Sequence, residues 1–217
     1  MKPINIIKVE SLNLLTGNWK SYLSINLLGI IVYTTLVFLG LVTLIIPGLI
    51  FSGFYSYMVA DINLKFIDNK QLEVKDLTIN KQMAKKIILT HLLRMLIGLL
   101  IILPFIMVSI LFLNTIGFFV VTIIANIVEA YFLIRTSFIY YILRDDDRSG
   151  LDVIAKSFML SKGNEWYIIK FYLSFLGWFI LLPLSLGVLG FWLIPYLKVS
   201  SAKLYRHLLE ENLKTNV

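Results

Sequence analysis

The chain has 217 residues, of which 59% are hydrophobic and 15% are charged, and its mean hydropathy is +0.85. Ordinary globular domains are about 45–50% apolar and about 25% charged, so a soluble enzyme of this size would leave too much apolar surface in water. The composition therefore indicates an integral membrane protein. The chain has no cysteine, which excludes disulfides, thiolate catalysis and cysteine-based metal sites.

Three long stretches carry no Asp, Glu, Lys or Arg, namely residues 21–60, 95–128 and 171–197. A helix needs about 20 residues to cross the roughly 30 Å bilayer core. With extension at their ends, the stretches predict one all-α membrane domain over residues 1–217, with about six transmembrane helices in three hairpins. The hairpins are expected at about 21–66, 87–143 and 166–205, with turns at Pro47-Gly48, at 114–117 and at 184–190. The third hairpin is short, and a re-entrant loop stays open as the alternative.

The distribution of charge predicts the orientation. Every Lys and Arg lies before residue 21, between 65 and 94, between 135 and 170, or after 197. The three expected turns carry no charge, which matches the excess of Lys and Arg that cytoplasmic loops carry. We therefore expect a multi-pass protein of a bacterial cytoplasmic membrane, with both termini in the cytoplasm. The net charge of +7 is attributed to these loops, and no nucleic-acid partner is expected.

A short amphipathic segment precedes each expected hairpin, around residues 2–15, 74–86 and 151–158. Such segments commonly lie as helices in the membrane interface, where lysines reach anionic headgroups. The second segment carries the basic residues Lys75, Lys81, Lys85 and Lys86. The sequence predicts three interfacial helices and a bilayer partner with anionic headgroups. Solvated connectors are the alternative interpretation.

An internal repeat links the first and third of these segments. Ser11, Leu14, Gly17, Asn18 and Trp19 match Ser157, Leu160, Gly163, Asn164 and Trp166, with one residue inserted after the second Asn. A glycine at this position would end an interfacial helix. The tryptophan after it would anchor the chain at headgroup depth.

The last third of the chain carries a resemblance to a known family. It reads Leu160-Ser161-Lys162-Gly163 and then Trp192-Leu193-Ile194-Pro195-Tyr196. This resembles a widespread bacterial family of multi-pass membrane proteins classed only as a domain of unknown function. That family is distantly similar to the membrane portion fused to some glycerophosphodiester phosphodiesterases. The resemblance implies fold and location, and it implies no activity and no catalytic residues.

Two charged residues fall inside the fourth expected span, Glu129 near its centre and Arg135 six residues later. Charges at that depth are costly, at about 2.5–3.5 kcal/mol each on insertion scales. Six residues of helix turn through about 600°, so the two side chains do not share a face. Each needs a partner on another helix or water. An ion or proton pathway and a structural polar contact both remain open.

Other candidate chemistry is sparse. Asp145, Asp146 and Asp147 suit either a divalent cation or a solvated acidic cluster at a helix start. His91 and His207 lie far apart without a ligand at metal-site spacing. No metal site, cofactor, nucleotide loop or nucleophile motif is expected.

The sequence therefore predicts a non-enzymatic membrane protein that acts through lipids, a membrane protein partner or a second copy of itself. Its expected role is accessory to a transporter, or protective against a membrane-active peptide or toxin. A small permease or channel that uses Glu129 and Arg135 is the alternative, and an intramembrane enzyme ranks third.

Overall fold

The computed structural model describes residues 1–43, 45–69, 71–112 and 115–215, apart from the side chains at 33, 37, 39–43, 45–47, 49, 75, 76 and 215. All regular secondary structure in the described residues is helical, and the prediction of an all-α protein is confirmed. In chain order they are α1 (Ile4–Leu15), α2 (Trp19–Thr43), α3 (Ile45–Ile67), the short 3₁₀ helix η1 (Val74–Leu77), α4 (Lys81–Leu111), α5 (Ile116–Arg135), α6 (Ile139–Asp145), α7 (Leu151–Ser161), α8 (Glu165–Leu173), α9 (Leu176–Leu184) and α10 (Gly190–Thr215).

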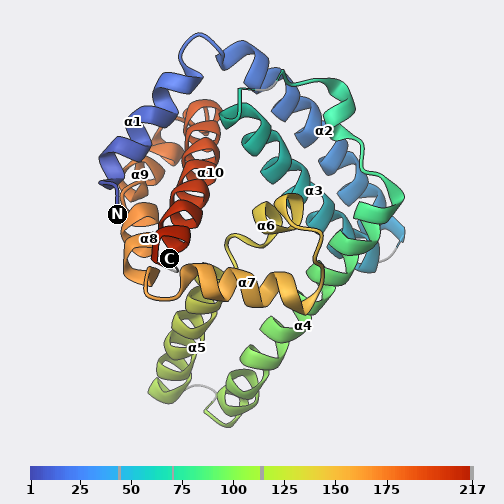
Figure 1. Ribbon diagram of the computed structural model, residues 1–217. Helices are drawn as coiled ribbons and strands as arrows, with labels where there is room; N and C mark the ends of the chain where they lie inside the picture. Colours follow the sequence, from blue (N-terminus) through green and yellow to red (C-terminus); the bar gives the residue numbers. More distant parts are fainter. Residues whose placement is uncertain (44, 70, 113–114, 216–217) are drawn as a thin grey trace.

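The helices form a body and a projecting hairpin (Figure 1). The far half of α4 and most of α5 extend away from the other helices, and α7 crosses at the point where they leave the body. Within the body, α1 and α10 run antiparallel. The Lys2 backbone N–H donates to His207 Nε2 at 2.9 Å, and Lys203 Nζ lies 3.2 Å from Glu10 Oε2. The N-terminal helix is thereby fixed along the C-terminal one.

α3 and α10 occupy the interior of the body. Every residue from Tyr57 to Leu64 of α3 is buried, because α2, α4, α6 and α10 all pack against this helix. In α10, Val199, Leu204 and Leu208 are fully buried. The apolar faces of these two helices therefore contact protein along much of their length.

Three segments are long and apolar enough to cross a membrane. They are α4 (Lys81–Leu111), α5 together with α6 (Ile116–Asp145), and α8 together with α9 (Glu165–Leu184). They indicate a multi-pass membrane protein. The prediction of six full spans is wrong for the chain as described, in which three helices meet the requirement. α10 shows one reason, because its apolar first half continues without a break into a charged, protein-covered second half.

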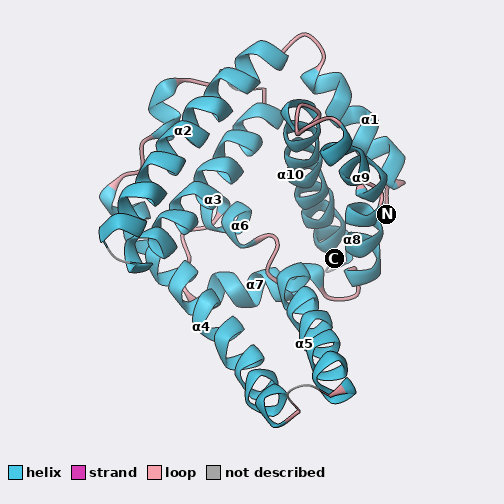
Figure 2. Cartoon of the chain, turned by 180° about the vertical axis from the view of Figure 1, so that it is seen from behind, coloured by secondary structure: helices cyan, strands magenta, loops and turns pink. Residues whose placement is uncertain are grey.

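Two of the expected turns also differ from the structure. Pro47-Gly48 lies inside α3, so the first helical hairpin does not turn there. The start of α5 and the turn between α9 and α10 lie at opposite ends of the molecule (Figures 1 and 2). Gly187 in that second turn lines the same cavity as Tyr22 near the start of α2. This arrangement is contrary to three equivalent hairpins with all their turns on one side.

Two of the three amphipathic segments form the expected helices. They are α1 and α7, and α7 buries Val153, Ile154 and Leu160 on one face. The second segment is instead the single 3₁₀ turn η1, and α4 begins at Lys81. The Asn80 side chain accepts a hydrogen bond at 2.8 Å from the Met83 backbone N–H, which caps α4 and places its start before the lysines.

The internal repeat has the same geometry in both copies. Gly17 and Gly163 adopt positive φ angles of 83° and 78° directly after α1 and α7, as a left-handed helix cap requires. Asn18 Nδ2 donates to the Leu14 carbonyl at 3.0 Å, and Asn164 Nδ2 donates to the Leu160 carbonyl at 3.4 Å. The matched Leu and Asn positions thus form the same hydrogen bond, which satisfies a carbonyl at each helix end.

A cluster of charged side chains joins α3, α6 and α10. Arg144 lies 3.2 Å from Asp61, 3.7 Å from Asp68 and 2.8 Å from Asp145. Arg206 of α10 lies 2.7 Å from Asp145 and 3.2 Å from Asp68. We call these five residues the Arg144 cluster. No sequence signal pointed to it, because its members are separated by up to 145 residues (206 minus 61).

A chain of polar side chains links α3, α4 and α6. His91 Nε2 lies 2.9 Å from Ser52 Oγ, and His91 Nδ1 lies 2.6 Å from the Tyr140 hydroxyl. The imidazole fits because residue 53 is glycine. A Cβ atom at Gly53 would lie 2.7 Å from His91 Cγ.

The caps give a first prediction. Replacing Gly163 with Ala should lower the free energy of unfolding by about 1–2 kcal/mol, because an L residue is strained at positive φ. A Cβ atom at Gly163 meets nothing within 4 Å, so the backbone angle alone causes the loss. Gly163→Asn should lose less, since Asn tolerates this region. Reversible unfolding in mixed micelles measures the change.

The matched control is Gly177→Ala. This glycine is inside α9, and its added Cβ also meets nothing within 4 Å, but its φ is ordinary. Stability should stay level or rise by up to about 1 kcal/mol. An equal loss in both variants would contradict the assigned cap.

Candidate membrane-embedded polar site

A groove runs between α4 and α5 in the projecting hairpin. Its walls are mostly apolar, and its polar side chains are Ser109 from α4 and Thr122, Asn126 and Glu129 from α5. The three α5 residues follow a spacing of four and three, which places them on one face of the helix. The sequence analysis identified Glu129 and missed the other three. The i, i+4, i+7 spacing of polar residues in an apolar helix was the signal available.

Glu129 lies half-buried in this groove. Asn126 Nδ2 donates to the Thr122 carbonyl at 2.7 Å, so that amide is partly satisfied by its own helix. Within the described parts of the chain, Glu129 forms no salt bridge. The groove therefore presents a carboxyl group beside apolar side chains on a hairpin of membrane-spanning length.

Arg135 is placed differently, at the inner end of α5. Its guanidinium forms an ion pair with Glu165 at the start of α8. The side chains are 9% and 26% exposed, so the pair is shielded from solvent on the Arg135 side. The Arg135 carbon Cζ also lies 5.1 Å from the centre of the Phe158 ring and 5.8 Å from that of Tyr131, within the range of cation–π contacts.

The backbone at Arg135 is bound as well as its side chain. Ser157 Oγ of α7 donates to the Arg135 carbonyl at 2.8 Å, which satisfies an unpaired carbonyl at the end of α5. Arg135 thus joins α5, α7 and α8. This favours the structural interpretation of Arg135, with a partner on another helix. The structure does not bring Arg135 together with Glu129 in a common polar path.

The four basic residues predicted at the membrane surface do not form one patch. Lys81 and Lys85 are exposed on the first turns of α4. Lys86 is bound instead, since its Nζ donates to the Asp147 carbonyl at 2.6 Å and its side chain is 16% exposed. The side chain of Lys75 lies outside the described residues. Lys81 and Lys85 therefore remain available to contact headgroups, and Lys86 holds α4 to the loop before α7.

The tryptophans of the repeat differ in exposure. Trp166 is 63% exposed, and Lys170 Nζ lies 5.5 Å from the centre of its ring. Trp19 is half-buried and packs against the cluster of Leu15, Tyr22 and Val199. An exposed Trp beside a lysine suits a headgroup anchor, and Trp166 fits that role better than Trp19.

Asp145, Asp146 and Asp147 each form an ion pair with a Lys or Arg side chain. Asp145 belongs to the Arg144 cluster, Asp146 lies 2.8 Å from Lys156 Nζ, and Asp147 pairs with Lys86. The Lys156 hydrogen bond lowers the pKa of the Asp146 carboxyl below its ordinary value. Across the described chain, no group of three or more His, Asp or Glu side chains is arranged to hold a metal ion. The acids therefore serve as ion-pair partners between α4, α6, α7 and α10.

The model of one protein family matches residues 1–212, and its description is a protein of unknown function, DUF975. The chain belongs to the DUF975 family. The resemblance seen in the last third thus extends over nearly the whole chain. Comparisons with curated proteins and with solved structures gave no match. The DUF975 family description names no activity.

The Arg135 pair gives a second prediction. A double-mutant cycle on Arg135→Met and Glu165→Gln should yield a coupling of about 1.5–3 kcal/mol, as for hydrogen bonds to charged groups away from water. The control cycle uses Lys2 and Glu10, whose side chains are 49% and 38% exposed. It should yield about 0.2–1 kcal/mol. Equal coupling in both cycles, measured by unfolding in mixed micelles, would refute a special role for Arg135.

Proposed function

We propose that this DUF975 protein is a non-enzymatic accessory protein of the bacterial cytoplasmic membrane that binds a transmembrane helix of a partner along its α4–α5 hairpin. Both termini lie in the cytoplasm in this proposal, as the distribution of Lys and Arg favours. The observation that carries the proposal is the polar groove on a projecting, apolar hairpin. The partner is a single helix with a hydrogen-bond donor or a cation opposite Glu129.

The exposure of the hairpin supports membrane insertion. Its large apolar side chains face outward, among them Leu99, Leu100, Ile116 and Phe119, which are 54%, 59%, 82% and 66% exposed. Contact with lipid chains removes the apolar surface of such residues from water. The groove is different, because a polar or charged side chain that faces hydrocarbon is costly. A second helix that covers Ser109, Asn126 and Glu129 would remove this cost and supply hydrogen bonds across the interface.

An accessory or protective role follows from this mode of binding. A helical segment of a transporter, or a membrane-active peptide against which the cell protects itself, has the required form. The distant likeness to the membrane portion fused to some glycerophosphodiester phosphodiesterases supports the same idea, since there a membrane module accompanies a separate working domain. Headgroup contacts by Lys81, Lys85 and Trp166 would hold the protein at its depth.

Site-specific crosslinking tests the groove. A photoreactive residue in place of Thr122 should capture a protein partner in cells. The same residue in place of Ile124, which is 45% exposed and about 200° around the helix, should capture lipid alone. The Thr122 product should disappear in a Glu129→Leu background. Identical products from both positions, or a Thr122 product that persists without Glu129, would overturn the proposal.

A permease or channel is the second candidate, and the half-buried carboxyl in the groove is the observation that favours it. If Glu129 relays protons or ions, purified protein in liposomes should conduct an ion under a gradient, and Glu129→Gln should abolish the flux while the protein stays folded. Arg135→Met should retain residual flux, because Arg135 is bound to Glu165 away from the groove. Absence of flux from the wild-type protein under proton, sodium and potassium gradients rules this candidate out.

A further inference from the structure

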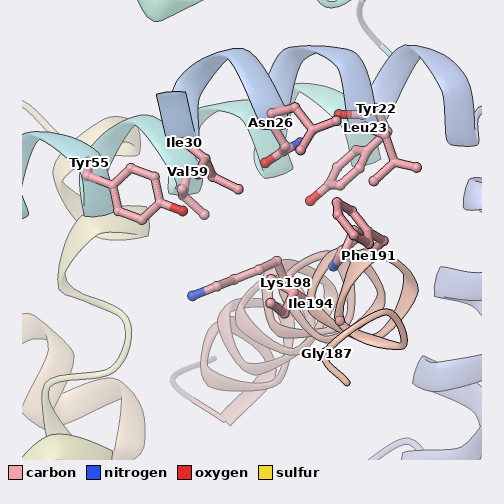
Figure 3. Close-up of a pocket in the computed structure, with 13 residues that line it drawn as sticks. Tyr22, Leu23, Asn26, Ile30, Tyr55, Val59, Gly187, Phe191, Ile194 and Lys198 are labelled. Atoms are coloured by element: carbon pink, nitrogen blue, oxygen red, sulfur yellow. The ribbon is translucent and has the colours of Figure 1, made fainter. Parts of the chain in front are cut away.

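A second cavity lies on the body, bounded by α2, α3 and the first half of α10 (Figure 3). Its volume is about 180 Å³. The walls are mainly apolar, from Leu23, Leu27 and Ile30 of α2, Val59 of α3, and Ile194 of α10. Its shape and lining suit a hydrocarbon segment.

One charged side chain enters this cavity. Lys198 of α10 extends into the space between α10, α2 and α3, and the Tyr55 hydroxyl points into the same space from above (Figure 3). Lys198 is half-buried, and no hydrogen bond or salt bridge joins it to any residue that the structure describes. Two other lysines, Lys203 of α10 and Lys8 of α1, do have partners. Lys203 is bound to Glu10, and Lys8 is bound to Ser174. A half-buried ammonium group without an anion is unfavourable. The position of Lys198 is therefore suited to an anion that belongs to a bound molecule.

The cavity opens onto a surface suited to lipid. Beside it on α2, Leu27, Ile30 and Ile31 are 39%, 38% and 60% exposed. On α10, Phe191 and Trp192 are 51% and 50% exposed. An apolar surface of this kind on both sides of the opening favours an occupant that arrives through the bilayer rather than from water.

The depth of Lys198 fits a phosphate group. Its neighbour Val199 is fully buried in one cluster with Leu15, at the end of the amphipathic helix α1, and Tyr22, near the start of α2. The amphipathic sequence of α1 favours a position in the membrane interface, at the level of the headgroups. The lysines after residue 197 favour the cytoplasmic side for this part of α10.

We propose that this cavity binds an anionic phospholipid of the cytoplasmic leaflet. The lipid phosphate pairs with Lys198 Nζ, one acyl-chain segment enters between α2 and α10, and the rest of the lipid lies on the exposed apolar surface. This site is separate from the α4–α5 groove and does not depend on a partner helix there.

Thermal unfolding of the full-length protein in a neutral detergent tests the site, with phosphatidylglycerol, phosphatidylcholine or inorganic phosphate added. Phosphatidylglycerol should raise the unfolding midpoint of the wild type, and the other two should not. Native mass spectrometry should show one retained phosphatidylglycerol. Lys198→Met should bind it about fivefold more weakly, as loss of one basic contact implies, and Lys198→Arg should restore binding. Without lipid, Lys198→Met should unfold about 2–4 °C higher, because an unpaired charge has been removed.

Lys20→Met is the matched control. It removes the same charge from an exposed position at the start of α2 and should leave phosphatidylglycerol binding unchanged. Equal stabilisation by phosphatidylcholine would leave no role for the charge, and equal stabilisation by inorganic phosphate would assign the site to a small anion. Either result overturns the proposal, as does unchanged phosphatidylglycerol binding in Lys198→Met. A failure here leaves the Thr122 crosslinking result unaffected, so the two proposals are tested separately.

Discussion

The guanidinium of Arg144 is the point at which separate parts of the chain are joined. It lies within ion-pair distance of Asp61 and Asp68 from the α3 region and of Asp145, which in turn binds Arg206 of α10. The Arg144 and Asp61 side chains are 15% and 12% exposed, so the charges depend on one another rather than on water. Removal of one member of such a network leaves its partner buried without compensation. The short helix α6, only seven residues long, is held in the middle of the body by these contacts and by the stacking of Tyr141 on Tyr205, whose ring centres are 5.2 Å apart.

The position of α6 determines the position of the candidate site. α6 follows α5 after three residues, and Arg135 at that junction is bound to both α7 and α8. The inner end of the hairpin is therefore rigidly attached, while its outer part extends beyond every other helix (Figures 1 and 2). A groove on such a hairpin is held at a fixed angle to the body. The charged network and the groove are thus connected through α6 and the end of α5, although they share no residue.

Local signals in the sequence predicted local features well. The matched glycines were expected to end two helices, and both do so at positive φ. The amphipathic patterns before α2 and α8 predicted α1 and α7, whereas the lysine-rich segment before α4, predicted in the same way, formed only a 3₁₀ turn. Arg135 was expected to need a partner on another helix or water, and in the structure it is paired with Glu165 of α8. Contacts between distant residues were not predictable, because nothing in one sequence indicates that Asp145 meets Arg206. The number of spans failed for a different reason, because α10 joins an apolar first half to a charged second half in one continuous helix, and only three segments of the described chain are long and apolar enough to cross a membrane.

The glycine beside His91 has a consequence for how α3 and α4 are spaced. With no side chain at residue 53, the imidazole of His91 lies directly against the α3 backbone, in the space that a Cβ atom would fill. The ring then contacts Ser52 through one nitrogen and Tyr140 through the other. A neutral imidazole has one donor and one acceptor nitrogen, and hydroxyl groups at both ends rotate to match either tautomer. Both neutral tautomers of His91 are therefore compatible with the contacts to Ser52 and Tyr140, and the two tautomers place the protons of these contacts in opposite directions.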